Sequence, residues 1–256
     1  MTRITGRRKL NSSRGQATGT SLRIGIGASS ASAHGDTHDD IAYASHIQSA
    51  GDITIAATDG DLNVIGSQIT GDNVALAASH NLNLLSQAEQ HTQKDSSANA
   101  SGEIGISLGS TTGIYLSLAG GLTRAHGNGE THTNSVVTAN DTLSLISGNA
   151  TTIVGAQARG NTVLANIGGN LSLASEQDTN DYASKNMQAG ITLVYGFSNT
   201  GVGVSGNLAY GQMDSDYASV TQTSGIAAGN GGYLINVGGN TDLKGDVGRW
   251  PFDPFF

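Results

Sequence analysis

The sequence predicts an all-β chain, namely a right-handed parallel β-helix (β-solenoid) with antiparallel β-hairpin excursions. Three observations predict it. Apolar residues recur at a spacing of two, as in Leu82 and Leu84 or Leu171 and Leu173, which places them on one face of a strand. Turn-forming stretches such as DGD, GDN, SHN and GGN separate these runs. Whole blocks of sequence also recur in register, which is typical of repeat architectures.

The composition differs from that of an ordinary enzyme. Charged residues make up 12% of the chain and aromatic residues 5%, and there are 37 glycines, two prolines and no cysteine. An average soluble domain carries about twice this charge and about half this glycine. The apolar fraction is 37%, and its Val, Ile and Leu are evenly spread, so we expect the chain to assemble a core and fold.

The net charge of -8 is unevenly distributed. Five of the twelve basic residues lie in the first fourteen positions, which we expect to form a disordered basic head (1–14): Arg3, Arg7, Arg8, Lys9 and Arg14. The remainder carries seven basic against twenty acidic residues. Nucleic acid is therefore not an expected partner, because its binding depends on neutralising phosphates.

The sequence has no run of about 18 apolar residues that would span a membrane as a helix. The stretch MTRITGRRKLNSSRG has the positive charge of a signal peptide without its apolar segment. Two alternatives remain open: the chain stays inside the cell, or it is a piece of a longer exported protein. The absence of cysteine suits both.

The clearest repeat relates residues 71–90 to residues 160–179, where Val163 follows Val74 by 89 positions. The same offset relates Asn81 to Asn170, Leu82 to Leu171, Leu84 to Leu173, and Gly66-Ser67-Gln68 to Gly155-Ala156-Gln157. Most polar residues differ between the copies, which indicates that a structural rung is repeated and not a binding site.

Shorter strand pairs begin at Ile53, Leu143 and Tyr233, and two long segments (91–135 and 179–224) resemble each other. The long segments are expected to form antiparallel hairpins with GSTTG and FSNTG as their loops. The repeats divide the chain into a partial unit (15–45), two units (46–135 and 136–224) and a second partial unit (225–247). The chain therefore resembles an excerpt that starts and ends within a unit.

Short strands with tight corners cannot bury an apolar face alone, so we expect successive turns of chain to stack on one another. Asn and Gly recur at the corners because those positions are expected to need a positive φ. Helix is expected to be a minor element, with one short turn in QAEQHTQKDSSA.

Several of these stretches resemble a known family. The block GSQITGDNVALAASHNLNLLSQAEQ, the polar stretches TNDYASKN and SDYASVTQ, and the late block GIAAGNGGYLINVGGNTDLKG resemble the haemagglutinin repeat of filamentous-haemagglutinin-type adhesins and contact-dependent growth inhibition proteins. The resemblance covers about residues 15–247, and the order of the pieces is more specific than any one of them.

The resemblance implies a fragment of an exported bacterial β-helical filament that acts in cell-cell adhesion or toxin presentation. It implies a secreted or cell-surface location, an outer-membrane two-partner secretion transporter as a partner through a missing N-terminal part, and a target-cell surface or outer membrane as the other partner. No catalytic residue, cofactor or small-molecule substrate belongs to this repeat. The tail (248–256, within DVGRWPFDPFF) departs from the pattern, and we interpret it as an out-of-frame or truncated end.

Three motifs resemble catalytic or ligand sites. GVGVSG, residues 201–206, fits a dinucleotide loop, but Ile226 stands where an acid is needed and the sequence continues as a strand. GISLG fits a nucleophile elbow at Ser107, yet the next copy has Thr192 there and lacks the last glycine. The spacing of His34 and His38 changes in the next copy, at His126 and His132, so we interpret all four as solvated loop residues and not as zinc ligands.

Asp residues in turns such as TDGD lack the spacing of a calcium loop. We therefore predict no catalytic, cofactor-binding or metal-binding residue. The alternative function is a membrane-associating delivery segment whose hairpins insert in a target outer membrane, since the strand pairs at residues 103–122 and 189–208 have the length that this needs. A β-helical polysaccharide-degrading enzyme is a third hypothesis, less favoured because the acids lie mainly in turns.

Overall fold

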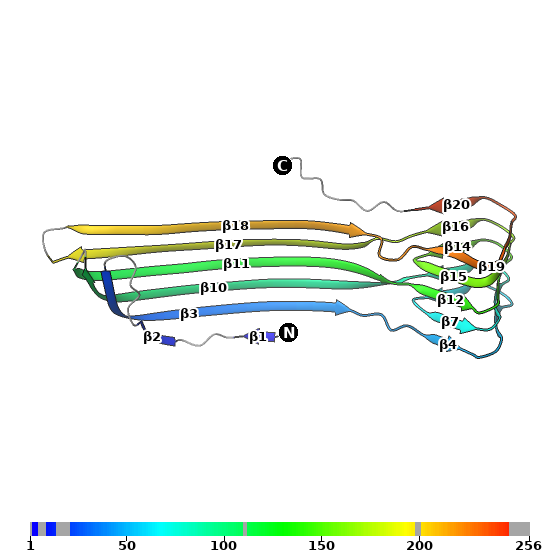
Figure 1. Ribbon diagram of the computed structural model, residues 1–256, viewed down its shortest axis with the longest axis horizontal. Helices are drawn as coiled ribbons and strands as arrows, with labels where there is room; N and C mark the ends of the chain where they lie inside the picture. Colours follow the sequence, from blue (N-terminus) through cyan, green and yellow to red (C-terminus); the bar gives the residue numbers. More distant parts are fainter. Residues whose placement is uncertain (1, 5–8, 14–20, 110–111, 198–200, 246–256) are drawn as a thin grey trace. The chain divides into compact units, whose positions relative to one another are not determined.

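The computed structural model describes residues 2–4, 9–13, 21–109, 112–197 and 201–245 (Figure 1). This part of the chain consists of strands, turns and bends without helix, so the all-β prediction is confirmed. No helix in it is long and apolar enough to cross a membrane. The helical turn predicted in QAEQHTQKDSSA is wrong, because these residues lie in strand β10 (Gln87–Gly109). The chain forms two compact units, the stack unit (39–91, 129–180, 216–256) and the hairpin unit (1–38, 92–128, 181–215).

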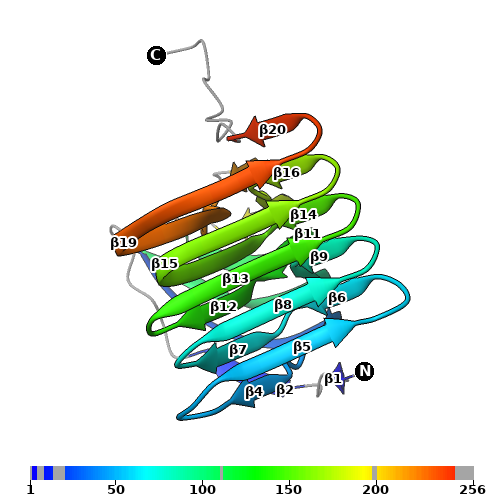
Figure 2. The same cartoon turned by 90° about the vertical axis from the view of Figure 1, so that its right-hand side faces the viewer.

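The stack unit is built from three ladders of parallel strands (Figure 2). The first contains β4 (His46–Gln48), β7 (Gln68–Gly71), β12 (Ser135–Ala139) and the first parts of β15 (Ala156–Ile167) and β19 (Gly225–Val237). The second contains β5 (Ile53–Ala57), β8 (Val74–Ala78), β13 (Thr142–Ser147) and the second parts of β15 and β19. The third contains β6 (Leu62–Ile65), β9 (Leu82–Leu85), β14 (Thr151–Val154), β16 (Leu171–Ala174) and β20 (Thr241–Lys244).

Each consecutive segment of the stack unit contributes one strand to every ladder, and we call such a segment a rung. The rungs in the described chain are residues 46–65, 68–85, 135–154, 156–174 and 225–244. Val74 and Val163 are not neighbours, because Leu143 pairs with both of them. The 89-residue period therefore comprises two rungs and the segment that separates them from the next pair.

Columns of apolar side chains from successive rungs form the core of the stack unit. Leu76, Leu145 and Ala165 pair across neighbouring rungs and are buried. The largest members of the core are the Leu, Ile and Val residues at the spacing of two that the sequence predicted. Burying each such side chain contributes about 1.5–3 kcal/mol, so the core stabilises the stack only when neighbouring rungs cover it.

Glycines at the corners serve two different purposes. Gly66 and Gly155 have φ values of 53° and 59°, so the expected positive φ is confirmed at these equivalent positions. At Gly148 and Gly168 a glycine is needed because the backbone of the neighbouring rung lies too close for a side chain. A Cβ at Gly148 would lie 2.0 Å from the Ser79 carbonyl oxygen, and one at Gly168 would lie 2.1 Å from the Gly148 carbonyl oxygen.

Polar corner residues also stack on one another. Asn81 donates its side-chain amide to the Asp61 carboxylate at 2.9 Å and accepts the Ala150 N–H at 3.2 Å. The equivalent Asn170, one period later, accepts the Asn240 N–H at 2.8 Å. These bonds satisfy corner backbone groups between rungs, which is why Asn recurs there.

The antiparallel sheet that gives the hairpin unit its strands contains β1 (Thr2–Ile4), β2 (Lys9–Ser13), β3 (Ser21–Asp40), β10, β11 (Gly113–Thr133), β17 (Asp178–Gly196) and β18 (Val202–Ser219). Its order is β1-β3-β10-β11-β17-β18, with β2 also on β3 (Figure 1). The two predicted hairpins are confirmed, and each strand continues through the polar stretches as well. Within the head predicted to be disordered, β1 and β2 pair with β3. The tail, 248–256, lies outside the described residues.

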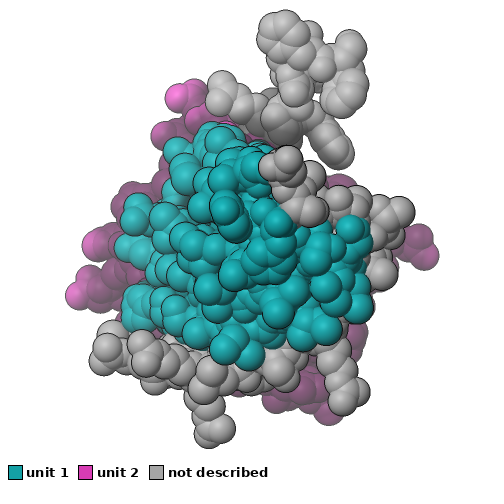
Figure 3. Space-filling view, turned by 90° about the vertical axis from the view of Figure 1, so that its left-hand side faces the viewer, with its two compact units in different colours: residues 1–38, 92–128, 181–215 teal, residues 39–91, 129–180, 216–256 magenta. Residues whose placement is uncertain are grey.

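The hairpin unit is coloured teal in Figure 3. Its sheet has two different faces. Gly25 faces Tyr115 and Glu103, and Ser117 bonds to Thr192, so one face carries small and polar residues. The alternate residues form the apolar face, and they are 37–77% exposed. Its members are Leu22, Ile24, Ile26, Ile104, Ile106, Leu108, Ile114, Leu116, Leu118, Ile191, Leu193, Tyr195, Val202, Val204, Leu208 and Tyr210.

Candidate functional site

The two glycine motifs lie in strands. Gly201 has a φ of 71° and precedes β18, so GVGVSG opens a strand and not the helix that a dinucleotide loop needs. Ser107 is buried within β10, between the exposed Ile106 and Leu108. A nucleophile elbow requires a turn from strand to helix, and β10 continues through this position as a regular strand.

The four histidines lie in strands, so the prediction that they lie in loops is wrong, but His34, His38 and His126 are exposed as predicted. His34 and His38 are in β3, and His126 and His132 are in β11. His34 is exposed and pairs with Asp36 at 3.0 Å. His132 differs from the other three, because its side chain is only 11% exposed.

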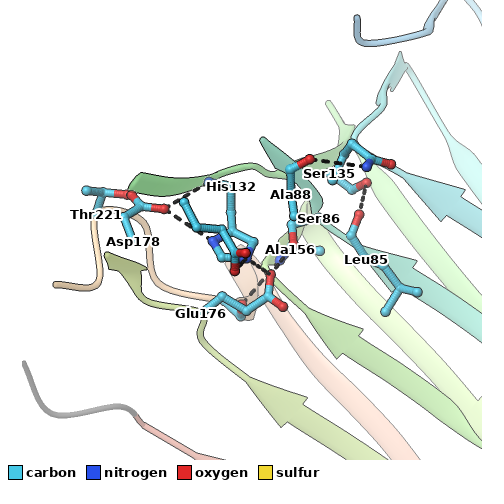
Figure 4. Close-up of polar contacts among 12 residues, drawn as sticks. Leu85, Ser86, Ala88, His132, Ser135, Ala156, Glu176, Asp178 and Thr221 are labelled. Atoms are coloured by element: carbon cyan, nitrogen blue, oxygen red, sulfur yellow. Dashed lines mark hydrogen bonds and ion pairs between the residues drawn. The ribbon is translucent and has the colours of Figure 1, made fainter. Parts of the chain in front are cut away.

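His132 lies beside a buried carboxylate (Figure 4). Asp178, at the start of β17 and 8% exposed, accepts the His132 backbone N–H at 2.9 Å and lies 3.3 Å from its ring Nδ1. The Thr221 hydroxyl donates to the second carboxylate oxygen of Asp178. One aspartate therefore joins the end of β11 to the segment that follows β18, and we call it the Asp178 clamp.

Two further carboxylates lie near the same imidazole. His132 Nε2 lies 3.6 Å from Glu130 and 3.8 Å from Glu176. The Ser86 hydroxyl donates to Glu176, which fixes that carboxylate within the stack unit (Figure 4).

A second clamp occurs one period earlier. Glu89 accepts the backbone N–H of Ala42 at 3.1 Å and the hydroxyl of Thr133 at 2.8 Å. Glu89 and Asp178 are 89 positions apart. Each accepts a backbone N–H, from Ala42 just after β3 or from His132 near the end of β11, and a threonine hydroxyl, from Thr133 at the end of β11 or from Thr221 just after β18. By this criterion the equivalent of His132 is Ala42, and not His38 as the sequence alignment suggested.

A buried serine repeats in the same way. Ser135 Oγ accepts the Ser67 N–H at 3.2 Å and donates to the Leu85 carbonyl at 2.6 Å. One period later, Ser224 Oγ accepts the Ala156 N–H at 3.2 Å, and the Ser224 N–H bonds to Ser175 at 2.9 Å. A few polar residues are therefore copied with the rung, and their shared role is to join segments, which agrees with the repetition of a structural unit and not of a binding site.

The chemistry of the cluster is that of a structural joint. A serine nucleophile needs its hydroxyl on the imidazole, whereas the Ser86 hydroxyl bonds to Glu176. Within the described residues, no group of three or more His, Asp or Glu side chains has the arrangement that holds a metal ion. The signal for both clamps was present in the sequence as an acid at the same offset of 89, but it is hidden because one copy is Glu and the other Asp.

The remaining ion pairs lie at the surface. Lys244 Nζ lies 2.8 Å from Asp242 in the last described strand of the stack. The hydrogen bond from Lys244 to Asp242, together with the charge of that carboxylate, raises the pKa of Lys244 above its usual value. Exposed pairs of this kind contribute little to stability, because water and salt screen them.

The comparison with known proteins agrees with the repeat geometry. The family model described as Hemagglutinin repeat matches residues 24–189. The chain belongs to the hemagglutinin repeat family. The match covers rungs of the stack unit and strands of the hairpin unit, so the family's repeat comprises both parts.

Relatives of this hemagglutinin repeat chain are CdiA proteins of enterobacteria. The Deoxyribonuclease CdiA of Dickeya dadantii is 36% identical over 91% of the chain and 7% of that protein. The Toxin CdiA of Escherichia coli is 32% identical over 81% of the chain and 7% of that protein. The 16S rRNA endonuclease CdiA of Enterobacter cloacae is 36% identical over 90% of the chain and 7% of that protein. The chain thus spans a small fraction of these relatives, and no solved structure matches it.

Proposed function

We propose that this chain is a stretch of an exported bacterial filament that acts in cell-cell adhesion or in presenting a toxin to a neighbouring cell. The observation that carries the proposal is the stack of rungs in register, with apolar columns and polar corners that repeat every two rungs. In this proposal the stack is a right-handed parallel β-helix, which gains length by adding rungs that each bury the previous one.

The relatives support this proposal, because the CdiA proteins are named as toxins and nucleases. The hemagglutinin repeat segment matches only about 7% of each of them. We propose that it serves as a spacer and a contact surface, reaches the cell surface through an outer-membrane two-partner secretion transporter, and meets the surface of a target cell.

Surface display can be tested in a bacterium that carries this sequence. Antibodies raised against the purified chain are expected to label intact cells, and labelling should disappear when the transporter gene is deleted. Protease added to intact cells should also remove the signal, while a cytoplasmic marker protein stays intact. A signal that needs cell lysis in both strains would overturn the proposal of export.

A second function is favoured by the apolar face of the hairpin unit. Five neighbouring strands present exposed aliphatic or aromatic side chains on one side, while the other side is small and polar. Soluble monomers rarely expose a contiguous apolar patch of this kind without a partner. We propose as the alternative that this face associates with the lipid of a target outer membrane.

Flotation of the chain with phospholipid vesicles separates the two functions. Ile106, Leu116 and Leu193 are 50%, 39% and 37% exposed, so changing all three to Ser should leave folding intact. Membrane association predicts that the wild type floats with vesicles and that the triple variant does not. Leu234→Ser is the matched control, because Leu234 is 69% exposed on the stack unit. If the wild type stays at the bottom of the gradient, membrane association is contradicted, and the displayed filament remains the proposed function.

A further inference from the structure

Strands β11 and β17 keep one register through the middle of the hairpin unit. The Ser117 hydroxyl lies 3.0 Å from the Thr192 hydroxyl, and the Thr123 hydroxyl donates to Asn186 Oδ1 at 3.5 Å. These two pairs are six residues apart on both strands, so no residue is inserted between them. All four side chains lie on the small, polar face of the sheet.

This register places Arg124 of β11 directly opposite Lys185 of β17. On the far side of them, a Cβ at Gly127 would lie 3.4 Å from the ring of Tyr182, so the same register continues. Because side chains alternate along a strand, Arg124 points to the face opposite that of Thr123, which is the apolar face. Arg124 and Lys185 are both exposed, and we call them the cation pair.

The cation pair lacks a counter-charge from the chain itself. Like charges directly opposite each other destabilise a sheet. Within the residues that the structure describes, neither Arg124 nor Lys185 forms an ion pair. Asp214, in the neighbouring strand β18, accepts a hydrogen bond from the Gln212 amide at 2.6 Å. Two positive charges are therefore open to an anion from outside the chain, although the net charge of the chain is -8.

An apolar band borders the cation pair on the same face. It consists of the alternate residues of 114–122 in β11 and of 187–195 in β17, nine positions on each strand. Nine residues span about 30 Å, the length a strand needs to cross the apolar part of a bilayer. Leu122 and Met187, 55% and 49% exposed, are the last members of the band before the pair. Beyond the pair, the next residue of β11 on this face is His126.

The cation pair and the band lie on interior strands. β11 has β10 and β17 as neighbours, and β17 has β11 and β18 (Figure 1). Further hairpins at either edge of the sheet would leave this face open, because strands pair through their edges and not through their faces. The exposure of the cation pair is therefore a property of the face.

We propose that the cation pair binds the anionic phosphate head groups of a lipid surface while the apolar band contacts the acyl chains. This binding rests on the membrane association proposed above, and adds which lipids are preferred and how deep the hairpin unit lies. Long cationic side chains at the end of an apolar segment reach the head-group layer. The guanidinium of Arg124 fits a phosphate with two parallel N–H donors, and Lys185 adds a point charge.

Flotation with vesicles of two compositions tests the preference for anionic lipid. The wild type should bind vesicles of phosphatidylcholine with phosphatidylglycerol more tightly than vesicles of phosphatidylcholine alone. Arg124→Gln combined with Lys185→Gln should weaken binding to the anionic vesicles by about 25-fold, since each cation near an anionic surface contributes about fivefold. The same double variant should bind the phosphatidylcholine vesicles as the wild type does.

A matched control removes two cations elsewhere. Arg159 and Lys244 are exposed on the stack unit, so Arg159→Gln combined with Lys244→Gln makes the same change of net charge. This control should bind both kinds of vesicle as the wild type does. Circular dichroism should show that both double variants keep their strands, because Gln retains the length of an exposed side chain.

Inorganic phosphate distinguishes a lipid head group from a free ion. Added at constant ionic strength, it should leave the fraction of chain bound to anionic vesicles unchanged, because the free ion makes no contact with the apolar band. Release as complete as that caused by the Arg124→Gln and Lys185→Gln changes would indicate a site for the free anion and would overturn lipid binding.

Fluorescent labels test whether the cation pair marks the boundary of the membrane, because the chain has no cysteine of its own. Leu118→Cys and Asn128→Cys place labels on one face of β11, about 34 Å apart and on opposite sides of the pair. Both positions are exposed. A dye that brightens in apolar surroundings should respond to anionic vesicles at position 118 and not at position 128.

The outcomes separate this binding from membrane association itself. A wild type that binds both vesicle compositions equally, or a double variant that keeps the preference, would overturn the role of the cation pair and leave membrane association in place. Equal responses of the two dyes would contradict the boundary at the pair. A wild type that binds neither composition would overturn membrane association together with this binding, and would leave surface display as the function.

Discussion

Asp178 and His132 are joined twice, once by the backbone N–H of His132 at 2.9 Å and once through its ring Nδ1 at 3.3 Å. Asp178 also receives the Thr221 hydroxyl, so one buried carboxylate links two segments that are distant in the sequence. Its counterpart Glu89 links Ala42 and Thr133. The first prediction concerns these two clamps.

Asp178→Ala should lower the free energy of unfolding of the stack by about 3 kcal/mol, because three donors lose their buried acceptor. Asp178→Asn retains one acceptor oxygen for the His132 N–H and should recover part of that loss. Urea denaturation followed by circular dichroism measures the change. The exposed Asp181→Ala serves as the control, and an equal loss there would contradict the clamp.

Glycine 148 should not tolerate a side chain. Gly148→Ala places a methyl group 2.0 Å from the Ser79 carbonyl oxygen, so neighbouring rungs must separate. We expect a loss of about 2–4 kcal/mol, measured by thermal or urea unfolding. Gly225→Ala, in β19, meets no atom within 4 Å and should change stability by less than about 0.5 kcal/mol.

Leu145 and Leu234 are predicted to respond differently to the same change. Leu145 is fully buried in the middle of the second ladder, and Leu145→Ala should cost about 2–5 kcal/mol through lost burial and the cavity that remains. Leu234 is 69% exposed, so Leu234→Ala should cost less than about 1 kcal/mol. Equal costs would mean that the core does not follow the observed columns.

Ser135→Ala should destabilise the chain by about 1–2 kcal/mol, because the Ser67 N–H loses its acceptor next to a fully buried side chain. Ser224→Ala removes the equivalent bond to Ala156 and should have the same sign with a smaller size, since Ser224 is only partly buried. Ser135→Thr keeps the hydroxyl but adds a methyl group, so its cost would come from packing and not from the lost bond. The three unfolding curves can be compared directly.

The sequence by itself determined which residues face inward and how often the pattern returns. The spacing of two at Leu82 and Leu84 and the offset of 89 between Val74 and Val163 are properties of the chain alone. They sufficed to predict an all-β chain, stacked segments and two hairpins, because a strand that buries one face must show this alternation.

Only the tertiary structure decided which segments are neighbours and which polar residues matter. Leu143, not Val163, lies against Val74, since the register of a stack depends on the order in which rungs are laid down. The clamps at Glu89 and Asp178 differ in side-chain length, and their partners lie 40 or more positions away. A carboxylate is selected there by the donors that surround it, and those donors come together only when the chain has folded.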